Sequence, residues 1–513
     1  MTLRLTGRTL DREGVIRVAR QAEPVVLDDE ARTRMRRSHS TVAAALARGD
    51  RIYGLTTAVG VLKRVAIGAD GAGPYSNRML RFHTVGQGPD APPELVRATL
   101  LRLANHFAEG STGVRPLLAE VLVECLNNGR LPRIRSLGSI GQADLAPLAD
   151  LAVGVFSDVE LEAGEGLALL GNNAFSTAWA ALAVNDATGL IDVLEIAGAL
   201  SLEGLAAVPG MLHPAIGRVR PYPGLQRSLA RLGWLLEGSD LWLLADPPQL
   251  QDPLTFRTLP QVLGACRDAL AHVDGVLAIE LNASQGNPIV LDDEERVISV
   301  ANFDVLPLAA ALDYLRIVLA SVLSASAERS VKLLQAPVTG LATGLAARAG
   351  TPDPGLTYLG IAVQALAAEA RLLAGPVSFE LTSTSHAEGV EDRATMAPLG
   401  ARRLADAVDL GRRIAAIELT VAAQAVDVRG MRSGAGTGRA QAAIRAWVPF
   451  LAAGDPVPDV EPLVAAIADG RLIAAVGDPG PDRVAAAAVR PGVAAAAVPP
   501  VAAPAGGSDV DRP

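Results

Sequence analysis

Apolar residues recur with helical spacing along most of the chain. The clearest case is residues 307–334, where apolar side chains fall three and four positions apart and form one stripe of a helix. Residues 400–426 repeat this spacing, and residues 180–207 are mostly apolar throughout. The chain is therefore expected to be mainly α, with long helices packed in a bundle. Shorter helices are predicted at residues 11–21, 29–48, 94–109, 117–126 and 361–373.

The composition favours helices packed on helices. Half of the 513 residues are hydrophobic but only 3% are aromatic, so the core has to be built mainly from aliphatic side chains, among which Ala and Leu are good helix formers. The formal net charge of −9 argues against non-specific nucleic-acid binding and against a basic membrane-binding patch. Asp313 and Arg316 interrupt the most apolar helix, so we expect no transmembrane span.

We expect a reduced, cytoplasmic protein. Cys125 and Cys266 lie far apart and lack the spacing of a zinc site, so we expect buried thiols and no metal. The first 20 residues are rich in arginine and lack the apolar segment of a signal peptide. The predicted organisation is a helical domain over 1–455, a helical extension over 456–483 and a disordered tail, rich in Ala, Val, Pro and Gly, over 484–513.

One stretch, residues 137–150, combines glycines with polar residues ahead of an apolar run: LGSIGQADLAPLAD. Gly138 and Gly141 permit positive φ angles and a close approach of the backbone. Asp144 is placed to cap a helix that begins near Leu145, and Pro147 suits the first turn of that helix. The stretch predicts a tight loop that leads into a helix N-terminus, where backbone N–H groups favour negative charge.

This loop resembles the signature of the histidine, phenylalanine and tyrosine ammonia-lyases and the related aminomutases, G-S-[VI]-G-A-S-G-D-L-x-P-L. The resemblance implies a mainly α fold with a long central helical bundle of the fumarase/aspartase type. It also implies a small-molecule substrate and a homotetramer whose active sites combine several chains. Other motifs of that family are matched in the same order along the chain, at residues 51–60, 77–88, 161–173, 249–264, 280–288, 299–305 and 378–396.

The chain departs from the family at the tripeptide that defines its chemistry. In the family, Ala-Ser-Gly cyclises with loss of two waters to give the electrophile methylidene-imidazolone (MIO). Here Gln142 and Ala143 replace it, and the segment is one residue shorter. Gln142 has no β-hydroxyl to lose. Ser139 is the nearest hydroxyl, but the branched side chain of Ile140 would hinder the ring-closing nitrogen, so we expect no MIO and no other cofactor.

The resemblance implies roles for residues in the other motifs. Tyr53 matches the base that removes the β-proton, and Glu391 matches the acidic residue near the substrate amine. Arg257 matches the arginine that pairs with the substrate carboxylate, to which a guanidinium donates two parallel hydrogen bonds. Gln142 and Asp144 are expected to occupy the space of the electrophile and to contact the leaving group. The other implied substrate-binding residues are Gly60, Phe82, His83, Asn173, Gln251, Asn287 and Phe303.

Three functions stay open. The main hypothesis is an elimination without MIO on a small aromatic or heteroaromatic amino-acid-like carboxylate, with Tyr53 as base and a better leaving group than a plain amine. One alternative is an inactive ligand-binding or regulatory subunit that pairs with an active paralogue; another is an ordinary ammonia-lyase for histidine or an aromatic amino acid. The main hypothesis rests on departures that cluster at positions forming or surrounding the electrophile, namely 142–143, Gly171, Leu254, Gly286 and Asp304.

Overall fold

The protein is mainly helical, as the apolar spacing predicts. The computed structural model describes residues 2–244, 251–379, 387–389 and 391–478. The long helices predicted from the sequence are all present, with boundaries that differ by a few residues. The predicted tail over 484–513 lies outside the described residues.

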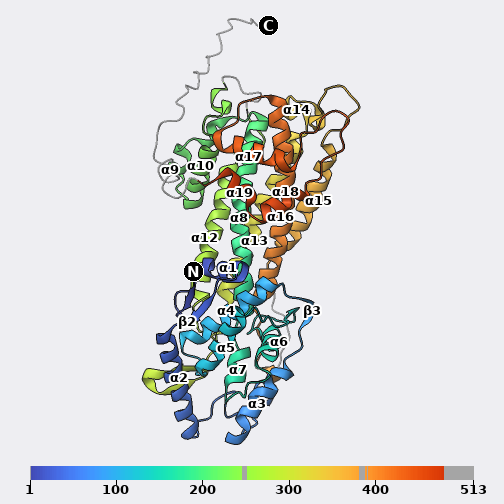
Figure 1. Ribbon diagram of the computed structural model, residues 1–513. Helices are drawn as coiled ribbons and strands as arrows, with labels where there is room; N and C mark the ends of the chain where they lie inside the picture. The colour runs from blue at the N-terminus through green and yellow to red at the C-terminus, as the bar shows by residue number, and fades with distance from the viewer. Residues whose placement is uncertain (1, 245–250, 380–386, 390, 479–513) are drawn as a thin grey trace, which may run out of the picture.

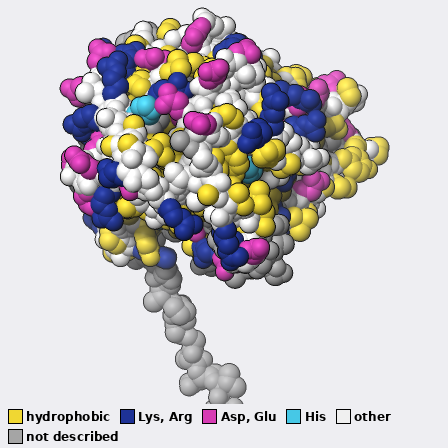
Figure 2. All heavy atoms as spheres, turned by 90° about the horizontal axis from the view of Figure 1, so that it is seen from below, with side chains coloured by type: hydrophobic (Ala, Val, Ile, Leu, Met, Phe, Trp, Pro, Cys, Tyr) yellow, Lys and Arg dark blue, Asp and Glu magenta, His cyan; other side chains and the backbone are white. Residues whose placement is uncertain are grey.

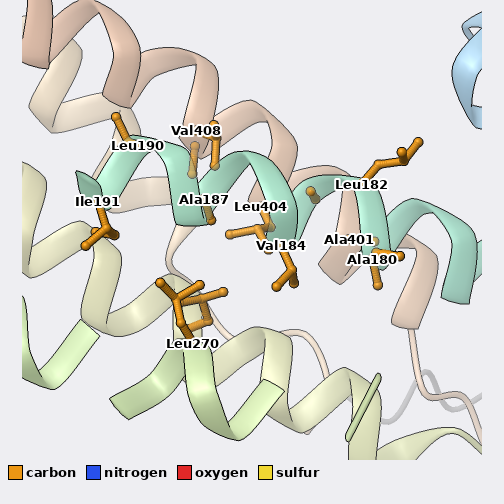
Figure 3. Packing of buried hydrophobic residues seen from close by; sticks show 14 of the residues in the cluster. Ala180, Leu182, Val184, Ala187, Leu190, Ile191, Leu270, Ala401, Leu404 and Val408 are labelled. Carbon is orange, nitrogen blue, oxygen red and sulfur yellow. The ribbon is translucent and has the colours of Figure 1, made fainter. Parts of the chain in front are cut away.

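Four long helices form the central bundle (Figure 1): α8 (Ala174–Leu205), α12 (Leu259–Glu280), α13 (Leu306–Leu333) and α16 (Ala397–Arg429). Helix α16 packs along α8 over much of its length. At this contact Leu404 and Val408 of α16 lie against small and branched residues of α8 such as Ala187 (Figure 3). Burial of these aliphatic faces is the main source of stability for such a bundle.

Shorter elements cover the lower end of the bundle in Figure 1. Three two-stranded sheets pair β1 (Leu3–Leu5) with β2 (Val25–Leu27) in parallel, and β3 (Gln87–Asp90) with β4 (Arg135–Leu137) and β5 (Ile289–Leu291) with β6 (Arg296–Ile298) antiparallel. The face at this end mixes acidic, basic and apolar side chains (Figure 2). The helices in this part of the chain are α1 (Arg12–Gln21), α2 (Asp29–Ala47), α3 (Ala69–Phe82), α4 (Pro93–Glu109), α5 (Pro116–Asn127), α6 (Leu145–Phe156) and α7 (Glu165–Leu170), with the 3-10 turn η1 (Gly60–Leu62).

The remaining helices gather at the other end. The extension expected after residue 455 contains two short helices, α18 (Glu461–Ala468) and α19 (Arg471–Val476), which pack against α8, α16 and α17 (Ala435–Trp447). The elements here are α9 (Ala215–Val219), α10 (Pro223–Leu235), α11 (Leu254–Arg257), α14 (Ala336–Thr339), α15 (Thr357–Leu373), α17 (Ala435–Trp447), α18 (Glu461–Ala468) and α19 (Arg471–Val476).

Several helices were not predicted from the sequence, including the long helix α12, and α3 is the one that its own sequence opposes. Residues 69–82 form α3, although Pro74 lies inside it. Proline and two nearby glycines hide the helical pattern in the sequence, because both residue types are unfavourable in a helix interior. Packing of α3 against α6 and α7 offsets that local preference.

In the part of the chain that the structure describes, two helical stretches are apolar and long enough to span a membrane by length and composition alone. They are residues 165–205, in which 89% of the most apolar window is buried inside the protein, and α13, in which 61% is buried. The first has the burial of a core helix. The second keeps an outward face, on which Tyr314 and Ile317 are 44% and 45% exposed.

A buried ion pair ties three of the central helices together. Arg329 of α13 donates from Nε and Nη2 to the two carboxylate oxygens of Glu418 in α16, at 2.6 and 2.9 Å. Ser201 of α8 donates to the same carboxylate at 2.7 Å, and Ser326 of α13 is a further donor. All four residues are buried, so each charge relies on the others in place of water.

Replacement of Glu418 by Ala leaves a guanidinium buried without its carboxylate. We expect the free energy of unfolding to fall by about 3–5 kcal/mol, measured by urea denaturation followed by circular dichroism. Asp409→Ala is the control, because it removes an exposed carboxylate that pairs with Arg413 one turn along α16. That change should cost less than about 1 kcal/mol. Equal losses in the two variants would contradict the role assigned to the buried pair.

Candidate active site

The glycine-containing loop predicted from the sequence connects β4 to α6. Gly138 and Gly141 have φ angles of 110° and 77°, and Ala143 also lies in the left-handed region at 59°. A Cβ atom on Gly141 would lie 2.2 Å from Oγ1 of Thr395. Glycine is therefore required at 141 both for the backbone angle and for the close approach of residue 395.

Two distant segments hold this loop. The carbonyl of Gly141 accepts hydrogen bonds from Thr395 Oγ1 at 2.7 Å and from Asn173 Nδ2 at 3.2 Å. The carbonyl of Ile140 accepts one from the backbone N–H of Met396 at 2.9 Å. The structure thus places Asn173 at the loop, together with residues 395–396, which directly precede α16.

Asp144 occupies the N-cap position of α6, as predicted, but its side chain accepts no capping hydrogen bond from the helix. Its side chain turns inward and is fully buried. One oxygen accepts from the hydroxyls of Ser139 and Ser176, and the other accepts from the backbone N–H of Ser176. Burial raises the pKa of the Asp144 carboxyl, and the hydrogen bonds from the two serines oppose that rise. In this arrangement Asp144 ties the loop to the start of α8.

Gln142 faces Asp304, which lies two residues before the start of the central helix α13. The two residues form an isolated antiparallel bridge, and Gln142 Nε2 donates to Asp304 Oδ2 at 3.2 Å. Arg393 donates from Nε to the same oxygen at 3.1 Å. Gln142 is therefore part of a polar cluster of three residues: Gln142, Asp304 and Arg393.

Tyr53 lies in the loop before η1, and its side chain is half-buried. Its hydroxyl accepts a hydrogen bond from the backbone N–H of Gly60 at 2.8 Å. Burial raises the pKa of Tyr53 above its usual value, the Gly60 N–H opposes this, and the charge of Glu391 raises it further. Glu391 lies near Gly60, since a Cβ on that glycine would be 4.0 Å from Oε1 of Glu391. Tyr53, Gly60 and Glu391 therefore lie together, with Tyr53 held in its protonated form.

Arg257 is not close to these residues within one chain. It ends α11, where its Nη1 donates to Gln251 Oε1 at 2.5 Å. The neighbouring Thr255 carbonyl accepts from Arg329 of α13. Arg329 stands 23 residues after Leu306 in that helix, which is about 35 Å along the axis. Arg257 and Gln251 thus lie near the opposite end of α13 from Asp304.

The other predicted residues occupy separate places at the lower end. Phe82 and His83 follow one another at the end of α3, where Phe82 is 62% exposed and His83 Nδ1 bonds to the Met79 carbonyl oxygen. Phe303 is half-buried directly before Asp304. Asn287 accepts from the Val300 N–H through Oδ1.

Asn287 also lines a small cavity of about 20 Å³ with Gly286 and the fully buried His106. Such a volume is enough for a single water. A Cβ on Gly286 would lie 3.7 Å from His106 Nε2, so the imidazole fills space beside the missing side chain at 286. Burial and the charge of Arg102 lower the pKa of His106 to about 3, so the ring is neutral.

Sequence reasoning missed Arg393, Thr395, Met396 and Ser176. Position 304 was recognised as a departure from the family pattern, which is a usable signal for Asp304. The serine at 176 carries no signal of its own, because a serine near the start of an apolar helix is common. Among the described residues no group of three or more His, Cys, Asp or Glu is placed to hold a metal.

Comparison with known proteins gives a consistent picture over most of the chain. The family profile "Aromatic amino acid lyase" matches residues 10–158 and 154–446. The histidine ammonia-lyase of Sorangium cellulosum (strain So ce56) is 36% identical over 509 residues, covering 92% of this chain and 98% of that protein.

Two solved structures share the fold. The ergothioneine degrading enzyme ergothionase from Treponema denticola, in complex with desmethyl-ergothioneine sulfonic acid, has a TM-score of 0.86 and 28% identity, over 92% of this chain and 100% of that one. Histidine ammonia-lyase from Trypanosoma cruzi has a TM-score of 0.85 and 26% identity, over 95% and 98%.

Proposed function

The chain belongs to the aromatic amino acid lyase family, and we propose that it is a carbon–nitrogen lyase that acts without the MIO electrophile. The substrate class is a small aromatic or heteroaromatic amino-acid-like carboxylate. The observation that carries this proposal is the replacement of the Ala-Ser-Gly tripeptide by Gln142 and Ala143, with Gln142 hydrogen-bonded to Asp304.

The residues of the loop do not fit MIO. Gln142 and Ala143 carry no hydroxyl, and Ser139 uses its hydroxyl to donate to Asp144 and to accept from the Gly141 N–H. The nitrogen that would close a ring next to Ser139 belongs to Ile140, whose carbonyl is bonded to Met396.

Without an electrophile to activate the amine, elimination requires a group that leaves readily on its own. Tyr53 accepts the proton from the β-carbon, the C–H electrons form the Cα–Cβ double bond, and the amine departs from the α-carbon with the C–N electron pair. A quaternary ammonium group leaves directly as a neutral tertiary amine. Ergothioneine is a betaine of this kind, so the similarity to ergothionase supports a histidine-like betaine as the substrate.

We propose that the site is completed by a second chain. Arg257 is the residue assigned to the substrate carboxylate, but its own chain places it near the far end of α13 from Asp304. The exposed side chains Tyr314 and Ile317 on α13 support an oligomer in which long helices pack together. A homotetramer satisfies both observations, because closed symmetry repeats one interface.

A second candidate is an ordinary histidine ammonia-lyase. The 36% identity to the Sorangium cellulosum enzyme, over nearly the full length of both chains, favours it. The two candidates differ in substrate: an ordinary ammonia-lyase converts histidine to its acrylate, whereas the proposed enzyme requires the trimethylammonium form. Purified protein is therefore assayed with histidine, phenylalanine, tyrosine and their trimethylammonium betaines, and arylacrylate formation is followed by ultraviolet absorbance.

In this assay we expect turnover of at least one betaine and no turnover of the free amino acids. Tyr53→Phe should lower kcat by about 10²–10⁴-fold, because it removes the base and keeps the ring. Tyr75→Phe is the matched control, because the Tyr75 hydroxyl also accepts a hydrogen bond from a backbone N–H of the loop that carries Tyr53, that of Val59. An unchanged rate in Tyr53→Phe, or turnover of histidine at full rate, would overturn the proposal.

The pH dependence follows from the raised pKa of Tyr53. The reactive form is the phenolate, so kcat/KM of the wild type should rise with pH through the neutral and alkaline range. Glu391→Gln removes a negative charge that raises this pKa, and the rise should therefore move to lower pH. Glu388→Gln, which removes an exposed carboxylate bonded to Lys63, should leave the profile in place. A shift to higher pH in Glu391→Gln would show that Tyr53 is not the titrating base.

Mixed oligomers test the shared site. Tyr53→Phe and Arg257→Ala should each be inactive alone. Co-expressed, they should recover part of the wild-type activity, because some sites then combine an intact Tyr53 from one chain with an intact Arg257 from another. The double variant Tyr53→Phe/Arg257→Ala, expressed with wild type at the same ratio, is the control for dilution. Mixed oligomers that assemble but stay inactive would show that a single chain supplies both Tyr53 and Arg257 to each site.

A further inference from the structure

The cluster of Gln142, Asp304 and Arg393 joins three segments that are far apart in the sequence. Gln142 belongs to the loop before α6, Asp304 to the turn before α13, and Arg393 to the segment before α16. Both side-chain bonds of the cluster converge on Oδ2 of Asp304, at 3.2 and 3.1 Å. Gln142 and Asp304 are also two positions at which the chain departs from the family pattern, so the departures are physically linked.

Asp304 is itself fixed. Its second oxygen, Oδ1, accepts from the backbone N–H of Leu306 at 3.0 Å, at the first turn of α13. A carboxylate at this position is stabilised by the unpaired N–H groups of the helix start. The carboxylate therefore offers Arg393 a defined acceptor on the central helix of the bundle.

The backbone beside Arg393 is held as well. Thr395 and Met396, two and three residues later, bond to the carbonyls of Gly141 and Ile140. An exposed Arg–Asp pair on its own contributes little to stability. Here the Arg393 side chain bonds through Nε to Asp304, and the backbone two and three residues later is bonded to the loop that carries Gln142, although the side chain is 52% exposed.

Only Nε of Arg393 is occupied. In the part of the chain that the structure describes, neither terminal nitrogen of its guanidinium has a hydrogen-bond or ion-pair partner. The edge formed by Nη1 and Nη2 is thus free, and this edge donates two parallel hydrogen bonds to a carboxylate, sulfonate or similar anion. Glu391, two residues earlier, carries the opposite charge and disfavours an anion at its own position.

We propose that Arg393 binds a second acidic group of the substrate. The inference rests on the proposed function, in which Arg257 takes the α-carboxylate. The rest of the amino-acid-like backbone is cationic, so a second anion has to be on the aromatic or heteroaromatic ring. Without a covalent electrophile, all of the substrate's orientation depends on noncovalent contacts, and a bidentate contact from Arg393, which Asp304 links to Gln142, supplies one of them.

The test measures binding to the purified oligomer by isothermal titration calorimetry. The probes are cinnamate and its 2-, 3- and 4-sulfonated derivatives, which have the carboxylate and ring of the proposed product. We expect at least one sulfonated probe to bind the wild type about 10- to 100-fold tighter than cinnamate, as one charged hydrogen-bonding contact provides. In Arg393→Gln the ratio of the two affinities should fall to about one. Arg393→Lys should keep part of the affinity gain of the sulfonated probe over cinnamate. Asp304→Asn should reduce this gain.

Arg413→Gln is the control, because Arg413 is also paired with an aspartate but lies on α16 away from the cluster; its affinity ratio should equal that of the wild type. A sulfonate that gives no gain in the wild type, or a gain that survives in Arg393→Gln, overturns the assignment of Arg393. In that case cinnamate binding that is lost in Arg257→Gln would leave the proposed function standing. Failure of every probe to bind, together with no turnover of any betaine, would overturn both.

Discussion

The loop at residues 137–144 depends on having its buried polar groups satisfied by other parts of the chain. Its backbone uses left-handed angles at Gly138, Gly141 and Ala143, and its carbonyls point to Asn173, Thr395 and Met396. A buried carbonyl without a partner is costly. The starts of α8 and α16 are therefore fixed relative to this loop, and the lower end of the bundle is organised around these contacts.

The central helices determine which of the predicted site residues can lie close together within one chain. Helix α13 carries Asp304 just before its first turn, while Arg329 anchors the segment of Arg257 near its far end. One straight helix thus holds two parts of the predicted site about 35 Å apart. The ion pair of Arg329 with Glu418 keeps α13 in register with α16, so this separation is a fixed property of the chain. In the proposed oligomer, a second chain would bring such distant groups to one substrate.

Much of the fold follows from the sequence, because long amphipathic and apolar segments specify helices over many turns. The helix at 69–82 could not be predicted in this way, since Pro74 and its neighbouring glycines oppose it locally and only packing on α6 and α7 offsets them. Motif matching singled out Tyr53, Glu391 and Asn173; the structure places Tyr53 and Glu391 near Gly60 and Asn173 at the loop of residues 137–144, and their roles stay predictions. Motif matching could not find Arg393, because its partner Asp304 lies 89 residues away and no local pattern links them. It also assigned Asp144 to helix capping, whereas the buried serine at 176 draws that carboxylate inward.

The intact mass of the purified protein tests most directly the proposal that this lyase fold works without the MIO electrophile. We expect the full mass of the unmodified chain, with peptides covering residues 137–150 also unmodified. A mass lower by two waters, located by fragmentation to this loop, would contradict it and would return the protein to ordinary ammonia-lyase chemistry.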